Sequence, residues 1–181
     1  ISNGKKRWIE KTPMHIRHID DIFSINENSK VILIIRDGRD VATSIQSRSG
    51  SITVGIDRWM SDNKIGQIFW EHPNVHVLHY EDIITDFTNT ISSVLNFIGE
   101  SYEENCQNHN QKDRHYYTSS IKKPVDASKK NHRQHRNWQI NHSLFDGRGK
   151  WKKLSQEDKN IINEHAADML KEYHYINDIN W

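Results

Sequence analysis

The sequence has little cysteine, little excess charge of either sign and no long apolar run. Cys106 is its one cysteine, so no disulfide can form within the chain. Chains without disulfides are typical of reducing compartments, and we expect a cytoplasmic location. The net charge of +1 gives no strong field that would select nucleic acid as a partner. No apolar run has the length of a membrane span, so we expect no membrane segment here.

Apolar residues are also sparse, at 34% of the chain, but they are grouped into periodic runs. Six tryptophans add large surfaces that can be buried. A length of 181 residues suits one ordinary domain, and we expect a single domain over residues 1–181. The chain starts at Ile1 rather than Met and shows no signal peptide, so we expect the natural N-terminus to lie upstream.

Strand-like runs alternate with helical patterns. VILII at residues 31–35 is typical of a strand buried on both faces, VHVLHY at residues 75–80 of a second strand, and RWIE at residues 7–10 of a short third. Apolar stripes and capping signals predict helices over residues 13–23, 39–48, 56–70, 88–98 and 155–173. This alternation predicts an α/β fold whose parallel sheet is flanked by helices.

Two of these helices carry clear signals at one end. Gly99 is placed to act as a C-cap for the fourth. Ser155, followed by Asp158, resembles a capping box with Asp in the Glu place, so the last helix should begin there.

The periodicity fades over residues 108–141, where we expect loops with short helices. A solvated surface explains the basic residues of this stretch more simply than an anionic-ligand site does. These basic residues include Lys122, Lys123, Lys129, Lys130, Arg133 and Arg136.

The segment RDGRDVATSIQSR follows the first strand and carries the clearest chemistry. Arg36 stands at the carboxyl end of that strand, where open α/β sheets bind ligands. Ser44 and Arg48 lie one helical turn apart on the helix that follows. Two guanidinium groups and a hydroxyl converging on one point would bind phosphate. The alternative is that Arg36 pairs locally with Asp37 or Asp40.

The pattern R-D-x-R-D-V-x-x-S after an apolar strand resembles the 3′-phosphate-binding segment of sulfotransferases that use PAPS (3′-phosphoadenosine 5′-phosphosulfate). The resemblance implies that Arg36 and Ser44 hold the 3′-phosphate of the donor. The version found here is also similar to protein-tyrosine sulfotransferases, which implies that Arg48 joins that site.

Three further segments resemble the same family, in the same order, over residues 7–175. WIEKTPMHI resembles the EKTP motif of carbohydrate-type and bacterial members, which implies that Lys11 lies near the transferring sulfuryl group. VHVLHYEDII resembles the strand that precedes R/H-Y-E-D-L. GRGKWKKLSQED resembles a late segment in which the cytosolic branch uses Arg-Lys-Gly at the 3′-phosphate. Arg148 is the nearest match, although the intervening Lys is missing.

The resemblance implies a P-loop-NTPase-like sulfotransferase fold, with a three-layer parallel sheet flanked by helices. No match to the family's early phosphosulfate loop, K/R-x-G-T/S-T/S, is present. We therefore expect an N-terminally truncated domain that lacks its first strand and that loop and has little activity. His15 is the candidate general base, against a solvated surface histidine. Glu10 is a structural partner rather than a base.

The function that follows from the resemblance is transfer of a sulfuryl group from PAPS to a hydroxyl or amine, releasing the desulfated product PAP. The acceptor stays open among a glycan, a tyrosyl peptide, a lipid and a small molecule. No metal is needed, and the 12 histidines show no ligand spacing typical of a metal site. One alternative is a non-catalytic module that binds nucleotide phosphates or polyanions. Another is a P-loop-kinase-like phosphotransferase, which would need a Walker A loop that the sequence does not contain.

Overall fold

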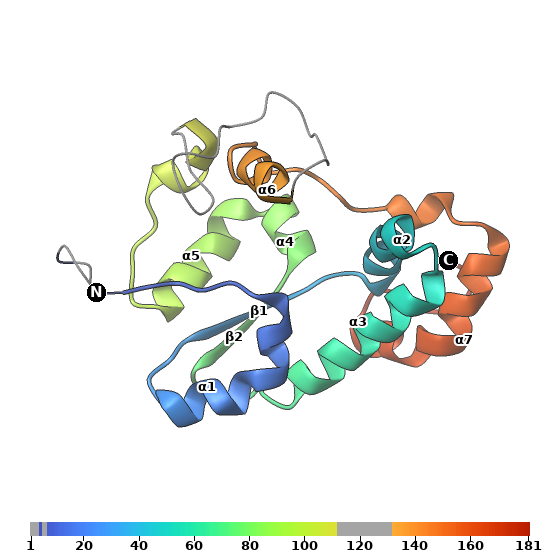
Figure 1. The fold of residues 1–181 in the computed structure, drawn as a ribbon, viewed down its shortest axis with the longest axis horizontal. Coiled ribbons are helices and arrows are strands. Elements are labelled where there is room, and N and C mark those ends of the chain that lie inside the picture. The colour runs from blue at the N-terminus through green and yellow to red at the C-terminus, as the bar shows by residue number, and fades with distance from the viewer. Residues whose placement is uncertain (1–3, 5–6, 112–131) are drawn as a thin grey trace. The chain divides into compact units, whose positions relative to one another are not determined.

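The computed structural model describes residue 4, residues 7–111 and residues 132–181, and it divides into two compact units. Residues 1–80 and 148–181 form the first unit, and residues 81–147 form the second. The first contains η1 (Pro13–His18), α1 (Ile19–Ile25), β1 (Val31–Ile35), α2 (Gly38–Ser49), α3 (Ile52–Gln67), β2 (Val75–His79), η4 (Lys150–Lys153) and α7 (Gln156–Glu172) (Figure 1). The second unit contains α5 (Phe87–Phe97), η2 (Glu104–Cys106), η3 (His109–Gln111) and α6 (His132–Ile140). Helix α4 (Tyr80–Thr85) begins at the last residue of the first unit's first segment and continues into the second unit. A single sulfotransferase-type domain over the whole chain stays a prediction.

The sheet of the described residues pairs β1 with β2 in parallel, from Val31 opposite Val75 to Ile35 opposite His79. Both long strand predictions are therefore confirmed, as is a parallel sheet flanked by helices. The third strand expected over residues 7–10 is wrong, because no strand forms there. Trp8 is 74% exposed, so this segment offers no buried face that a sheet could hold.

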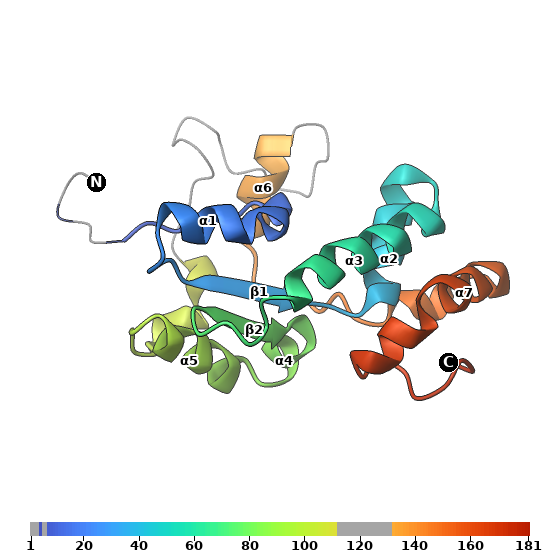
Figure 2. The ribbon, with the colours of Figure 1, turned by 90° about the horizontal axis from the view of Figure 1, so that it is seen from below.

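The expectation that β1 is buried on both faces is also wrong. Leu33 and Ile35 are buried, whereas Ile32 and Ile34 are exposed. Successive side chains of a strand point to opposite faces. Helix α1 lies along one face of the pair (Figure 2), where Ile19 packs with Leu33. The helices of this unit thus cover the odd-numbered positions of β1 and leave the even-numbered ones open.

The larger apolar cluster lies where α2, α3 and α7 pack against one another (Figure 1). Ala42, Ile56, Ile162 and Leu170 are almost fully buried in it. Gly55 lets α2 and α3 approach closely, because a Cβ there would lie 2.7 Å from the Cα of Ala42. This packing holds the start of α2, and with it the segment that carries Arg36.

Capping residues explain where several of the helices begin. Asp37 caps α2 by accepting from the backbone N–H of Arg39 at 2.9 Å. Ser51 caps α3 in the same way, so this helix starts before the predicted residue 56. The predicted cap at Ser155 is confirmed, since its hydroxyl accepts from Asp158 N at 3.1 Å. The helix predicted from residue 13 begins as the 3₁₀ turn η1 before α1.

In the second unit, α5 matches the predicted fourth helix within one residue at each end, and Gly99 follows it with a φ of 74°. Arg136 of α6 donates to Gln139 Oε1 at 2.8 Å. Arg133 also lies on α6, and four further basic residues of this stretch lie outside the described residues: Lys122, Lys123, Lys129 and Lys130. Within residues 4, 7–111 and 132–181, no helix is long and apolar enough to cross a membrane.

Candidate functional site

Arg36 lies directly after β1, at the carboxyl ends of both parallel strands. Its guanidinium sits over the ring of Tyr80, with Cζ 4.6 Å from the ring centroid, and Tyr80 directly follows β2. The backbone carbonyl of Arg36 accepts a hydrogen bond from Trp59 Nε1 at 2.8 Å. The carboxyl edge of a parallel sheet is where open α/β folds bind ligands. The first predicted site residue therefore stands at that edge.

Arg39, three residues further on, is a structural residue. It is buried, and its Nη2 donates to Asp37 Oδ2 at 2.7 Å and to the carbonyl of Tyr175 at 3.0 Å. Its guanidinium also lies 4.0 Å from the ring centroid of Trp151. This arginine connects the cap of α2 to the C-terminal part of the chain. Of the two arginines in RDGRD, only Arg36 therefore has a guanidinium that is not committed to this connection and stands at the strand end.

Asp40 joins the start of α2 to a distant turn. Its Oδ2 accepts from the backbone N–H of Gly149 at 2.8 Å, and its Oδ1 accepts from that of Trp151 at 3.2 Å. The same Oδ2 lies 3.9 Å from Nη2 of Arg36, as the alternative of local pairing anticipated in part. We call this set of contacts the Asp40 clamp. It brings the peptide that follows Arg148 beside the carboxylate that faces Arg36, while the Arg148 residue itself is exposed.

Ser44 and Arg48 lie on α2, one turn apart and therefore on the same side of the helix. Ser44 is half-buried and Arg48 is exposed. Within the described part of the chain, neither the Ser44 hydroxyl nor the Arg48 guanidinium has a hydrogen-bonding or ionic partner. Both groups are therefore available to bind a ligand.

His15, the candidate base, is paired with Glu10, the expected structural partner. Nδ1 of His15 lies 2.6 Å from Glu10 Oε2, and Thr12 Oγ1 donates to Glu10 Oε1 at 2.6 Å. A carboxylate on Nδ1 favours the tautomer in which Nε2 accepts a proton. Lys11 is exposed, and its ammonium forms no ion pair with any residue in the described ranges. Residues 10–15 thus offer a cation and a carboxylate-bound imidazole close together in the sequence.

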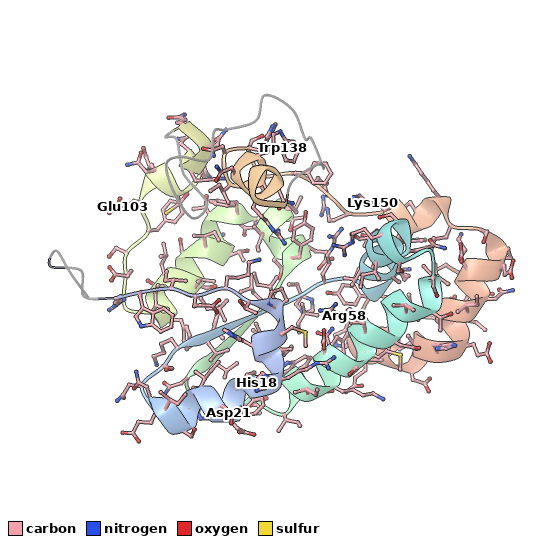
Figure 3. The ribbon with its side chains drawn as sticks, in the orientation of Figure 1. His18, Asp21, Arg58, Glu103, Trp138 and Lys150 are labelled. Carbon is pink, nitrogen blue, oxygen red and sulfur yellow. The ribbon has the colours of Figure 1, made fainter. Side chains whose placement is uncertain are left out.

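Helix α3 contacts both the N-terminal segment and the end of β1 that carries Arg36. Arg58 Nη2 lies 3.5 Å from Met14 Sδ in η1, and Arg17 Nη2 donates to Asp62 Oδ1 at 2.6 Å (Figure 3 labels Arg58). The neighbouring Trp59 holds the carbonyl of Arg36. As placed in this structure, neither Lys11 nor His15 forms a hydrogen bond or ion pair with the predicted phosphate-binding residues Arg36, Ser44, Arg48 and Arg148.

Tyr173 packs against Trp59, the residue that holds the carbonyl of Arg36. Its ring packs edge-on against Trp59, with centroids 5.6 Å apart, and its hydroxyl donates to Asn63 O at 3.3 Å. Burial, with a smaller contribution from Glu172, raises the pKa of Tyr173 to about 12. The phenol is therefore neutral at physiological pH and acts as a packing residue.

Sequence reasoning missed the Asp40 clamp. Its one sequence signal was the second Asp of RDGRD, which can equally well stabilise its own helix N-terminus. Among the described residues, no group of three or more His, Cys, Asp or Glu side chains is arranged so that it could hold a metal ion.

Comparison with known proteins gives one finding. The model of the family described as the sulfotransferase family matches residues 1–104. This match spans more than half of the 181 residues and includes the Glu10–His15 segment and the whole of α2, but not the turn at Gly149. No match was found among curated proteins.

Proposed function

This chain belongs to the sulfotransferase family, and from that membership we propose that it transfers a sulfuryl group from PAPS to a hydroxyl or amine acceptor and releases PAP. Family membership by itself indicates sulfuryl transfer and implies a P-loop-like fold. The acceptor we propose is a glycan, a tyrosyl peptide or a small molecule with a nucleophilic hydroxyl or amine.

The donor's 3′-phosphate is proposed to bind at the carboxyl edge of the sheet. Arg36 and Arg148 would supply its main charged contacts, with the hydroxyl of Ser44 and the guanidinium of Arg48 completing the site. The observation that carries this proposal is the Asp40 clamp, because it brings the turn after Arg148 beside the carboxylate that faces Arg36. Charge-assisted hydrogen bonds from arginine to phosphate are among the stronger contacts available in proteins.

The transfer step is proposed to use residues 10–15. The bond between sulfur and the bridging oxygen of the donor breaks, and a bond forms between sulfur and the acceptor oxygen or nitrogen. Lys11 would stabilise the negative charge that develops on the leaving phosphate. Nε2 of His15 would take the proton that the acceptor loses, with Glu10 holding the ring through Nδ1. No step in this scheme requires a metal.

Titration calorimetry tests the donor site directly. PAP should bind more tightly than AMP, which lacks the 3′-phosphate, and Arg36→Ala should weaken PAP binding about tenfold or more. Arg17→Ala is the matched control, because it removes the same charge from a side chain bonded to Asp62. Equal affinities of the unmodified chain for PAP and AMP would overturn the donor assignment.

A further inference from the structure

We propose that Asp40 is a positioning residue that holds the 148–151 turn in place, so that Arg148 reaches the phosphate bound by Arg36. This role rests on the proposed function, in which both arginines contact the 3′-phosphate. Asp40 would not touch the ligand itself. It would act through the backbone of the turn and, by its charge, on Arg36.

The contacts of Asp40 all lead away from its own helix. It lies in the first turn of α2, where a carboxylate commonly interacts with the helix N-terminus. Both oxygens are instead bonded to backbone N–H groups of the turn, at Gly149 and Trp151. The residue is 1% exposed, so water does not replace these bonds. A buried carboxylate needs such partners, and this one finds them more than a hundred residues along the chain.

These two bonds are direct tertiary anchors of the turn's backbone. Gly149 has a φ of 75°, and a Cβ added there would approach only the flexible side chain of Lys152, at 3.7 Å. A side chain at residue 149 would therefore meet no backbone, only a side chain that can move. Arg148 is exposed, and the bond from Gly149 N to Asp40 anchors the backbone directly after it, alongside the packing of Trp151 against Arg39 and Trp181.

Charge and position make opposite predictions for a variant at Asp40. Removing a carboxylate 3.9 Å from Arg36 makes the site more positive, and this alone would tighten phosphate binding. Releasing the turn would withdraw Arg148 and weaken phosphate binding. Weaker binding in an uncharged variant thus cannot come from the change in charge.

Asp40→Asn keeps the shape of the side chain but places an NH₂ group against one of two backbone donors. We expect PAP to bind about tenfold more weakly to this variant, roughly the value of one lost arginine–phosphate contact, while AMP affinity changes less than about twofold. Hydrogen exchange at the amides of Gly149 and Trp151 should become faster. Asp168→Asn is the matched control, since Asp168 is exposed on α7 and has no partner among the described residues.

Two further variants keep the test decisive if Asp40→Asn folds poorly. Gly149→Ala leaves Asp40 intact but strains a backbone with positive φ, and it should also weaken PAP binding selectively. In an Arg148→Ala background, Asp40→Asn should cost less than about twofold further, because both changes remove the same contact.

Three outcomes would overturn the role of Asp40 alone: tighter PAP binding in Asp40→Asn, unchanged PAP binding with a lower melting temperature, or a full additional loss in the Arg148→Ala background. Equal affinity of the unmodified chain for PAP and AMP is a different failure. It would remove the proposed donor site and, with it, this role.

Discussion

The two regions to which we assign chemistry are built in contrasting ways. Around α2, Asp40 is 1% exposed and is bonded to a turn far along the chain. In the N-terminal segment, the side chains of His15 and Glu10 are 48% and 38% exposed, and their bonds are to each other and to Thr12. The Asp40 side chain is held by tertiary contacts, whereas the Glu10 and His15 side chains bond within residues 10–15, and the tertiary contact of that segment comes from Met14 against Arg58.

The contrast fits two different roles, donor binding near α2 and contact with the acceptor in residues 10–15. A donor site must hold several charged groups around one phosphate, and rigid surroundings limit the entropy lost when the ligand binds. A group that meets an acceptor must remain accessible to it. The arrangement predicts that substitutions near α2 affect stability and donor binding, and that substitutions in residues 10–15 affect turnover.

The largest effect should come from Lys11→Ala. We expect turnover to fall by about 10²–10³-fold, the typical cost of one group that stabilises transition-state charge, with PAP affinity changed less than about twofold. Sulfate transfer from labelled PAPS, alongside calorimetry, measures both. Lys64→Ala, on the exposed side of α3, serves as the control. A raised KM for the donor with unchanged turnover would place Lys11 in the donor site instead.

Packing between α2 and α3 should give the next effect. Gly55→Ala puts a Cβ 2.7 Å from the backbone of Ala42, so the helices must separate. We expect the free energy of unfolding to fall by about 1–3 kcal/mol, as measured by urea denaturation. Ser61→Ala, an exposed position of the same helix, should be close to neutral. A neutral Gly55→Ala would mean that the α2 region is less tightly packed than its burial indicates.

High pH should lower the stability of the fold through Tyr173. Burial raises the pKa of Tyr173 from 10.0 to about 12, so the unfolded chain loses the phenol proton before the folded chain does. The contribution of Tyr173 is therefore fully present below pH 10 and is lost as the pH rises through about 12. Denaturation midpoints at several alkaline pH values measure this loss. Tyr173→Phe should flatten that part of the profile, and an unchanged slope would assign the pH dependence to other groups.

The smallest effect on stability should come from Glu10→Gln. Both ends of its bond to His15 are substantially exposed, and such pairs contribute about 0–1 kcal/mol. Thermal unfolding should therefore stay close to that of the unmodified chain, even though turnover falls because the His15 ring is less well held. A large drop in melting temperature would show that residues 10–15 stabilise the fold, and would erase the contrast between the two regions.

Local signals in the sequence were enough to place most elements. The apolar runs gave β1 and β2, and Ser155 and Gly99 marked helix ends, because strand periodicity and caps depend on neighbouring residues. The expected strand over residues 7–10 failed for the opposite reason. A strand needs a partner and a buried face, and Trp8 shows that this segment has no such face.

For the site, the sequence by itself determined that Arg36 follows a strand. It also determined that Ser44 and Arg48 share one side of α2. Periodicity and strand ends are properties of a short stretch, so they could be read directly. Only the tertiary structure decided that Asp40 bonds to Gly149, which lies 109 residues further along the chain. Asp40 could have served its own helix terminus, and the choice of the distant turn arises because burial removes water and requires the nearest available N–H groups.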